Sequence, residues 1–214
     1  MKEDELLAWI DIETTGLDPL EDKLLEVACI VTTQSLEEIN RDEWQLKFTG
    51  QDASNRFDHA REPIPHIVYQ MHKESGLWSD CGRSDLLEHE WVEEFEEFLQ
   101  DCLNVNDWAT KFVMAGSGVA RFDYTWFQFN YQRLLEKFTY YCFDVGVIRR
   151  GLVLVDLIES LENKTLAHRA MMDIEDHIEE WKYYKGLITL GSKDGQWEAW
   201  TPNAWRFDNS NDSE

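Results

Sequence analysis

The sequence predicts an α/β fold. Three apolar segments separated by short polar turns come first, a long amphipathic segment follows, and further apolar segments then alternate with helical ones. The first pattern is typical of an antiparallel meander of strands, and the alternation after it is typical of helices that pack against a sheet. We therefore expect a sheet covered by helices.

The N-terminal half is expected to contain three strands and two helices. Its first strand ends in carboxylates, just before the turn signals of Thr15–Pro19. Its longer helix repeats apolar residues at helical spacing and places acidic residues on the other face. We expect strands at residues 6–12, 24–33 and 44–48, helices at 64–71 and 85–103, and an irregular polar segment at 50–65.

The C-terminal half is expected to alternate strands with helices. We expect strands at residues 111–115 and 140–145, and helices at 122–138, 153–161 and 167–190. Beyond Gly191 the chain becomes rich in Gly, Asn and Asp and carries Trp197, Trp200 and Trp205. These observations predict one domain at residues 1–190 and an acidic, Trp-containing tail at 191–214.

Composition favours a folded protein that does not associate with membranes. The chain has 214 residues, enough for one large domain, and 43% of them are hydrophobic. Its apolar runs are all shorter than the roughly 20 residues needed to cross a bilayer, and its N-terminus does not resemble a signal peptide. The four cysteines have no metal-ligand spacing. We therefore expect a cytoplasmic protein with reduced cysteines.

The charge of the chain disfavours nucleic-acid binding by simple attraction. Acidic residues number 43 against 20 basic ones, and the resulting formal net charge of −23 repels a long polyanion. A carboxylate-rich site, however, gains positive potential when divalent metal binds, and a short nucleic acid presents few phosphates. A solvated acidic surface that keeps the protein soluble is the alternative explanation.

Three sequence elements carry residues suited to metal-dependent chemistry. Asp11 and Glu13 lie two residues apart at the end of the first strand, so both carboxylates point to one face. Asp123 follows a small-residue turn at the start of a helix, and His168 and Asp173 lie near the start of the last helix. Each element alone has an ordinary explanation, such as a solvated strand end, an N-cap or a surface histidine. Together they place four carboxylates and one histidine in a fixed order.

This order resembles the three motifs of the histidine subclass of the DEDD exonuclease family (DEDDh). The segments that carry the resemblance are Trp9–Leu17, Phe122–Asp123 and His168–Asp173. Within the family, His72–Leu77 and Ala167–Met171 are most similar to the oligoribonucleases, which degrade very short RNA from its 3′ end. The similarity extends from about Leu6 to about Leu187.

The resemblance implies a ribonuclease H-like fold, with a mixed five-stranded sheet and helices on both faces. It also implies a 3′→5′ exonuclease that hydrolyses the 3′ ends of short single-stranded RNA, or DNA, to nucleoside 5′-monophosphates. The implied metal ligands, which would hold two Mg²⁺ or Mn²⁺ ions, are Asp11, Glu13, Asp123 and Asp173. His168 is the implied general base, which would take a proton from the attacking water.

The resemblance also implies substrate contacts. The candidates are Thr14, Gly16, Leu17, Tyr69 and His72. Leu17 would act as a wedge against the terminal bases, and Tyr69 would stack on a base because Ile67 occupies the position of a Trp in oligoribonucleases. Two alternatives remain open: Leu17 is an ordinary turn residue, and His72 is a cap or a hydrogen-bonding partner of a loop.

One departure from the oligoribonuclease pattern concerns substrate length. The family holds the substrate's 5′ phosphate with an Arg and hydroxyl residues around the fifth strand, whereas the corresponding segment here is Tyr141–Val147. The first alternative function is therefore a broader exonuclease, similar to ribonuclease T or a proofreading subunit. A second alternative is a non-catalytic module whose acidic surface binds a basic protein.

Two further expectations concern assembly and neighbouring carboxylates. The resemblance implies a homodimer, and exposed aromatics such as Tyr140 would suit its interface. Asp18, Asp22 and Glu26 lie near the motifs in sequence, and we expect ordinary turn and surface roles for them.

Overall fold

The computed structural model describes residues 2, 4–48, 64–159 and 168–193. The chain divides into two compact units, Met1–Glu180 and Trp181–Glu214. The predicted boundary after residue 190 remains a prediction. The tail with Trp197, Trp200 and Trp205, and most of the irregular segment expected at 50–65, lie outside the described residues.

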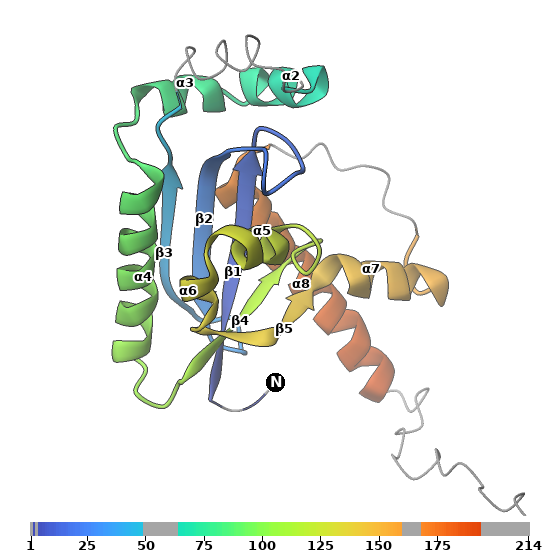
Figure 1. Cartoon of the computed structure of the whole chain (residues 1–214). Helices are drawn as coiled ribbons and strands as arrows, with labels where there is room; N and C mark the ends of the chain where they lie inside the picture. Colours follow the sequence, from blue (N-terminus) through green and yellow to red (C-terminus); the bar gives the residue numbers. More distant parts are fainter. Residues whose placement is uncertain (1, 3, 49–63, 160–167, 194–214) are drawn as a thin grey trace, which may run out of the picture. The chain divides into compact units, whose positions relative to one another are not determined.

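A mixed five-stranded sheet forms the centre of the first unit, in the order β3-β2-β1-β4-β5 (Figure 1). Its strands are β1 (Glu5–Thr14), β2 (Leu24–Thr32), β3 (Glu38–Gln45), β4 (Lys111–Gly116) and β5 (Phe138–Asp144). The first three strands pair antiparallel, as the predicted meander requires, whereas β4 runs parallel to β1 and β5 parallel to β4. The C-terminal ends of β1, β4 and β5 therefore meet at one edge of the sheet.

Seven helices are described: α2 (His66–Glu74), α3 (Leu77–Arg83), α4 (Glu88–Asn104), α5 (Asp123–Asn130), α6 (Gln132–Leu135), α7 (Val145–Leu154) and α8 (Ala170–Lys193). Alternate residues of β1, such as Ala8 and Ile10, pack in one core with Trp91 and Phe95 of α4 and with Phe127 of α5. Figure 1 shows α4, α5 and α6 on the near side of the sheet and the start of α8 behind it. Helices thus cover both faces, and the predicted ribonuclease H-like fold is confirmed.

Strand β3 does not lie where the sequence predicts it. The apolar signal at residues 44–48 marks only the end of the strand, since β3 spans Glu38–Gln45 and most of its side chains are exposed. It is an edge strand that pairs with β2 alone. Because its partner supplies backbone hydrogen bonds whatever the side chains are, a largely polar sequence is sufficient to form it.

Two helix predictions were wrong in their limits. The single helix expected at 122–138 is two helices, α5 and α6, separated at Tyr131, whose backbone (φ −133°, ψ 44°) is not helical. At 153–161 the described residues form no separate helix: α7 ends at Leu154, begins at Val145 directly after β5, and is capped at its Val147 amide by the Asp144 side chain. Its two glycines hide this helix in the sequence. Helix α3 was not expected at all.

The described part of the chain contains no helix that is both long enough and apolar enough to cross a membrane.

Candidate active site

The end of β1 presents two carboxylates on one face of the sheet. Asp11 and Glu13 are separated by one residue, so both side chains lie on the face opposite the one that Ile12 contributes to the core. In the neighbouring strand β2, Ala28 pairs with Asp11 and Glu26 pairs with Glu13. Because β1 pairs with the fully buried strand β2, the backbone that carries these two carboxylates is held rigidly.

Asp123 comes to the same place from the other side of β1. It is the first residue of α5, it is buried, and its Oδ1 accepts a hydrogen bond from the backbone N–H of Ile12 at 3.1 Å. Burial raises its pKa to about 7, although backbone hydrogen bonds oppose this shift. The hydrogen bond joins the second motif directly to the first.

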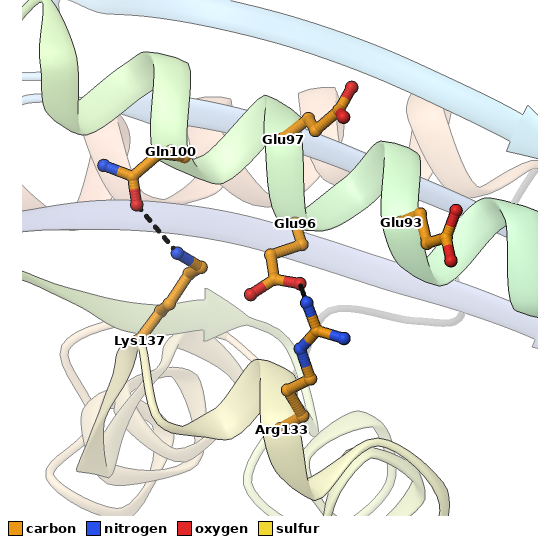
Figure 2. A pocket seen from close by; sticks show the side chains of 6 residues that line it. All are labelled: Glu93, Glu96, Glu97, Gln100, Arg133 and Lys137. Atoms are coloured by element: carbon orange, nitrogen blue, oxygen red, sulfur yellow. Dashed lines mark hydrogen bonds and ion pairs between the residues drawn. The ribbon is translucent and has the colours of Figure 1, made fainter.

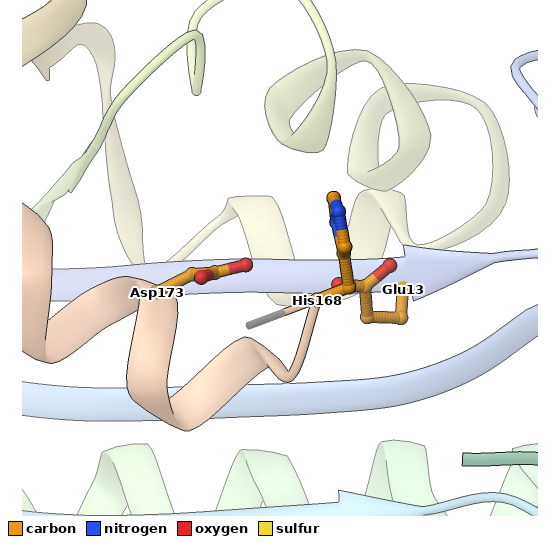
Figure 3. Close-up of side chains that lie close together, drawn as sticks. All are labelled: Glu13, His168 and Asp173. Atoms are coloured by element: carbon orange, nitrogen blue, oxygen red, sulfur yellow. The ribbon is translucent and has the colours of Figure 1, made fainter. Parts of the chain in front are cut away.

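The third motif lies at the beginning of α8. His168 precedes the helix in a left-handed backbone conformation (φ 51°), and Asp173 lies in the first turn of the helix, where it is buried. Ligand atoms of Glu13, His168 and Asp173 all lie within 4.8 Å of one another, and Figure 3 shows the three side chains directed toward a common space. The structure thus brings together residues 160 positions apart in the chain.

The carboxylates of this group raise one another's pKa. Burial raises the pKa of Asp11 well above its usual range, and the negative charges of Asp123, Glu13 and Asp173 add to the effect. For Glu13 the pKa rises to about 8, again through burial first and through Asp173 and Glu26 next. Such crowding is unfavourable unless positive charge is supplied. Several carboxylate oxygens and one imidazole are suitable ligands for a hard divalent cation, so the donor set fits the implied metals.

His72 lies behind these carboxylates. It is 0% exposed, and its Nε2 donates a hydrogen bond to the carbonyl oxygen of Thr14 at 2.8 Å. Its Nδ1 lies 3.9 Å from Glu13 Oε2 and has no hydrogen-bond partner among the described residues. Trp78 covers the ring at a centroid distance of 5.2 Å. The hydrogen bond to Thr14 agrees with the alternative reading of His72 as a residue that secures a loop.

The turn after β1 carries the other candidate substrate contacts. Asp22 closes this turn, because it accepts hydrogen bonds from Thr15 Oγ1 and the Asp18 amide at 3.0 Å each. Leu17 protrudes from the turn and is 81% exposed. Thr14 Oγ1 donates to the Gly16 carbonyl, so both residues shape the turn itself. Asp18 and Asp22 therefore have the turn roles expected of them.

Tyr69 lies on α2 with 44% of its surface exposed, and its ring lies near that of Trp78 at 6.0 Å. Ile67 on the same helix is more exposed still. Helix α2 thus exposes an aromatic ring and an aliphatic side chain, both of which are available for contact with a base.

Glu26 is the residue of this region that sequence reasoning misjudged. It was expected at the surface, yet its side chain is completely buried and pairs with Arg169, the residue after His168. The position within a strand of nine buried residues was the available signal, because a carboxylate there must have a partner.

The segment Tyr141–Val147, which covers the end of β5 and the start of α7, lacks side chains of the kind expected for a phosphate pocket. The hydroxyl of Tyr141 donates to the carboxylate of Glu5, and Gly146 has no side chain. A Cβ at Gly146 would lie 2.7 Å from Ser117 Oγ, so a side chain at this position would require the Ser117 hydroxyl to move. Arg149 of α7 is the nearby cation, and it pairs with Glu180 and donates to Ser117 Oγ at 3.3 Å.

A separate hollow of about 370 Å³ lies on the outer surface, between α4 and the segment around α6 (Figure 2). Its lining residues are Glu93, Glu96, Glu97, Gln100, Arg133 and Lys137. Arg133 pairs with Glu96, and Lys137 Nζ donates to Gln100 Oε1 at 2.9 Å. Because both cations already have partners, this hollow offers no convergent group comparable to those at the end of β1.

Comparisons with known proteins place the chain among nucleases. The model of the exonuclease family RNase_T matches residues 8–180. The chain is 29% identical over 188 residues to a probable oligoribonuclease of Drosophila melanogaster, covering 85% of this chain and 82% of the relative. It is 30% identical over 184 residues to an oligoribonuclease of Rhodococcus jostii (strain RHA1), covering 84% of this chain and 85% of that protein.

Among solved structures, E. coli exonuclease I in complex with a dT13 oligonucleotide is similar at a TM-score of 0.61 and 16% sequence identity. The similarity covers 85% of this chain but only 41% of exonuclease I, so it supports the fold alone.

Proposed function

This chain belongs to the RNase_T exonuclease family and is a nuclease, and we propose that it removes nucleotides from the 3′ ends of short single-stranded RNA as the oligoribonucleases do. The observation that carries this proposal is the convergence of acidic side chains from β1, α5 and α8 beside His168. The products would be nucleoside 5′-monophosphates, and DNA ends are a second substrate class.

Four carboxylates are the proposed ligands of two Mg²⁺ or Mn²⁺ ions: Asp11, Glu13, Asp123 and Asp173. When bound, such ions supply an activated water and neutralise charge on the phosphoryl and leaving oxygens. The carboxylates keep their mutual positions through the backbone of β1, to which Asp123 is hydrogen bonded. Their raised pKa values support cation binding, since a cation removes the repulsion that causes part of the shift.

His168 is the proposed general base, which takes a proton from the attacking water. Its ring lies beside Glu13 and Asp173, and these carboxylates would stabilise the imidazolium that forms. The same proximity allows a different role, in which the imidazole is itself a metal ligand. A variant of His168 distinguishes the two roles, as described in the Discussion.

The exposed side chains around the first motif are the proposed contacts for the terminal bases. Leu17 protrudes from the rigid turn and would separate or support the bases, and Tyr69 would stack on one of them. The shape of this turn depends on two hydrogen bonds, from His72 to the Thr14 carbonyl and from the Thr14 hydroxyl to the Gly16 carbonyl. Through this shape, the three residues would affect how the substrate binds.

A broader substrate range is the second candidate function. It is favoured by the segment Tyr141–Val147, where the Tyr141 hydroxyl is engaged with Glu5 and Gly146 contributes no side chain to a 5′-phosphate pocket. Without such a pocket, binding should depend little on where the 5′ end lies. An enzyme similar to ribonuclease T would then cleave longer substrates as well as short ones.

The decisive experiment measures the release of 5′-mononucleotides from labelled RNA and DNA, from dinucleotides to oligonucleotides of about twenty residues, with Mn²⁺ or EDTA. Trimming that needs Mn²⁺ and starts at the 3′ end is the expected result. A steep preference for the shortest RNA would support the oligoribonuclease-like activity, and equal rates at all lengths would support the broader one. If the wild-type protein cleaves none of these substrates with Mn²⁺, or with Mg²⁺ in its place, the proposed function is wrong.

We also propose that the protein forms a homodimer through the β5 edge of the sheet. Strand β5 is one of the two edge strands, and Tyr140 on it is 89% exposed; α7 adds the exposed apolar residues Val147 and Leu154 nearby in sequence. Sedimentation velocity should give twice the chain mass of 25.3 kDa for the wild type. The substitution Tyr140→Ser should weaken the association. A wild-type protein that is monomeric at micromolar concentration would refute the proposed homodimer.

A further inference from the structure

Glu26 occupies an unusual position for an acidic residue. It lies in the central strand β2, pairs across the sheet with Glu13, and is 0% exposed. Burial of a carboxylate away from water destabilises the fold unless charged or polar partners donate hydrogen bonds to its oxygens. Its partners therefore indicate what the residue holds in place.

The partners of Glu26 come almost entirely from the segment that follows His168. Arg169 donates from Nη2 and Nε to Oε1, at 2.8 and 3.1 Å, and the backbone N–H of Ala170 donates to Oε2 at 2.9 Å. Gln45 of β3 donates from Nε2 to Oε1 at 3.0 Å. The guanidinium of Arg169 also reaches Asp80 of α3, with Nη1 2.9 Å from Oδ2.

This network acts on two parts of the chain that meet at the site. Ala170 is the first residue of α8, so its N–H has no acceptor within the helix, and the Glu26 carboxylate both accepts that bond and interacts favourably with the positive end of the helix. On the other side of Arg169, His168 holds a left-handed backbone conformation that is unfavourable for a residue with a side chain. Such a conformation persists only when the surroundings hold it.

We propose that Glu26 is a positioning residue for the nuclease site: by binding Arg169 and the amide of Ala170, it fixes the turn that presents His168 and the helix start that presents Asp173. The inference rests on the proposed function for its catalytic consequence, but its structural content is independent of it. Glu26 itself does not touch the substrate.

An exposed ion pair offers a matched control. Arg41 of β3 pairs with Glu175 of α8 at 2.6 Å, so it also joins the sheet to α8, but its side chain is 42% exposed and Glu175 is 51% exposed. If any link between the sheet and α8 were sufficient, Arg41→Gln and Arg169→Gln would have similar effects. If the buried network positions the site, only Arg169→Gln should affect it.

The test compares Glu26→Gln, Arg169→Gln, Arg169→Lys and Arg41→Gln with the wild type. Glu26→Gln retains an oxygen acceptor but loses the charge, and we expect kcat for short RNA with Mn²⁺ to fall about 10–100-fold, the range found for groups that orient metal ligands. KM should change less than about twofold, since the groups that Glu26 positions, His168 and Asp173, are proposed to act on the reacting atoms and not on substrate binding. Arg169→Lys keeps the charge but cannot span Glu26 and Asp80, so its loss should be smaller than that of Arg169→Gln.

Two measurements do not depend on cleavage. Hydrogen exchange should show faster exchange at the Ala170 amide in Glu26→Gln and Arg169→Gln, and Mn²⁺ titration followed by electron paramagnetic resonance should show weaker binding. Thermal unfolding identifies any variant that has simply lost its fold. If Glu26→Gln or Arg169→Gln does not fold, the same measurements are made on Arg169→Lys. The proposal is overturned if these variants keep wild-type exchange at Ala170, or if Arg41→Gln causes the same losses. Absence of cleavage by the wild type would refute the proposed function without deciding this inference.

Discussion

Two regions of the molecule are rich in acidic residues, and they differ in what surrounds the carboxylates. On α4, the side chains of Glu93, Glu94, Glu97 and Asp101 are exposed, and two of them, Glu93 and Glu97, line a hollow whose cations already have partners. At the end of β1, Glu13 and Asp123 are buried beside Asp173. The pKa of Glu13 rises to about 8 and that of Asp123 to about 7. Acidic composition alone therefore does not identify the reactive carboxylates, whereas burial and mutual repulsion do.

The same contrast accounts for the net charge of −23 in a nuclease. Carboxylates on α4 are solvated, so their repulsion of a short nucleic acid is weakened by salt. Those at the end of β1 are shielded from water, and a bound cation changes the sign of the local potential.

The largest effect should come from Asp11→Asn. The substitution removes a proposed metal ligand while keeping the shape of the side chain, and we expect kcat to fall by about 10⁴-fold or more, because metal stabilisation of the reacting charges contributes several kcal/mol. Glu93→Gln on α4 is the matched control, since it removes one acidic charge from an exposed position. Equal activity of the two variants with Mn²⁺ would contradict the comparison.

Substitution of His168 by Gln should lower kcat by about 10²–10⁴-fold, the contribution typical of a general base. If His168 acts as the base, Mn²⁺ affinity should remain close to that of the wild type. If it is a metal ligand, as its position within 4.8 Å of Glu13 and Asp173 also permits, Mn²⁺ affinity should fall together with kcat. Measuring both quantities on the same variant separates these roles.

The stability of the metal-free protein should decrease as pH rises. Glu13 and Asp123 have pKa values of about 8 and about 7 in the folded protein, against ordinary values of 4.5 and 3.8, so the folded state binds protons that the unfolded state has released. Their stabilising contribution is complete below about pH 4 and is lost as pH rises through about 7 to 8, by on the order of a few kcal/mol. Unfolding midpoints in EDTA should therefore fall between pH 6.5 and 8.5, and Mn²⁺ should reverse the fall.

A buried histidine makes the choice of pH range important. Burial lowers the pKa of His177 to about 4, so its contribution to stability is lost only as pH falls below its ordinary value of 6.5. Above that value it stays neutral in both states and does not affect the comparison. If the metal-free protein became more stable between pH 6.5 and 8.5, the raised pKa values of the site carboxylates would be refuted.

The smallest effect should come from Arg133→Gln beside α4. Arg133 pairs with Glu96, but its side chain is largely exposed, and exposed pairs contribute about 0–1 kcal/mol. We expect a change in the free energy of unfolding within that range and no change in kcat, as measured by urea unfolding and by cleavage of short RNA. A large loss of activity would show that the α4 surface takes part in substrate binding.

Much of the fold could be predicted from the sequence because its signals are local. Apolar runs such as Leu24–Thr32 indicate buried strands directly, and the spacing of Asp11 and Glu13 places both on one face of a strand. The edge strand β3 and helix α7 were misplaced because neither has a continuous apolar pattern. Strand β3 depends on its pairing with β2, and α7 begins where the Asp144 side chain caps it.

The sequence by itself determined the order of the carboxylates and His168, and with it the family of this protein. Only the tertiary structure decided which further charges belong to the site. Glu26 and Arg169 are 143 positions apart, and their pairing arises because β2 and the start of α8 meet on one face of the sheet. Burial and electrostatic partners are properties of packing between remote segments, so a residue that looks like an ordinary surface carboxylate in sequence can become a buried anchor of the site.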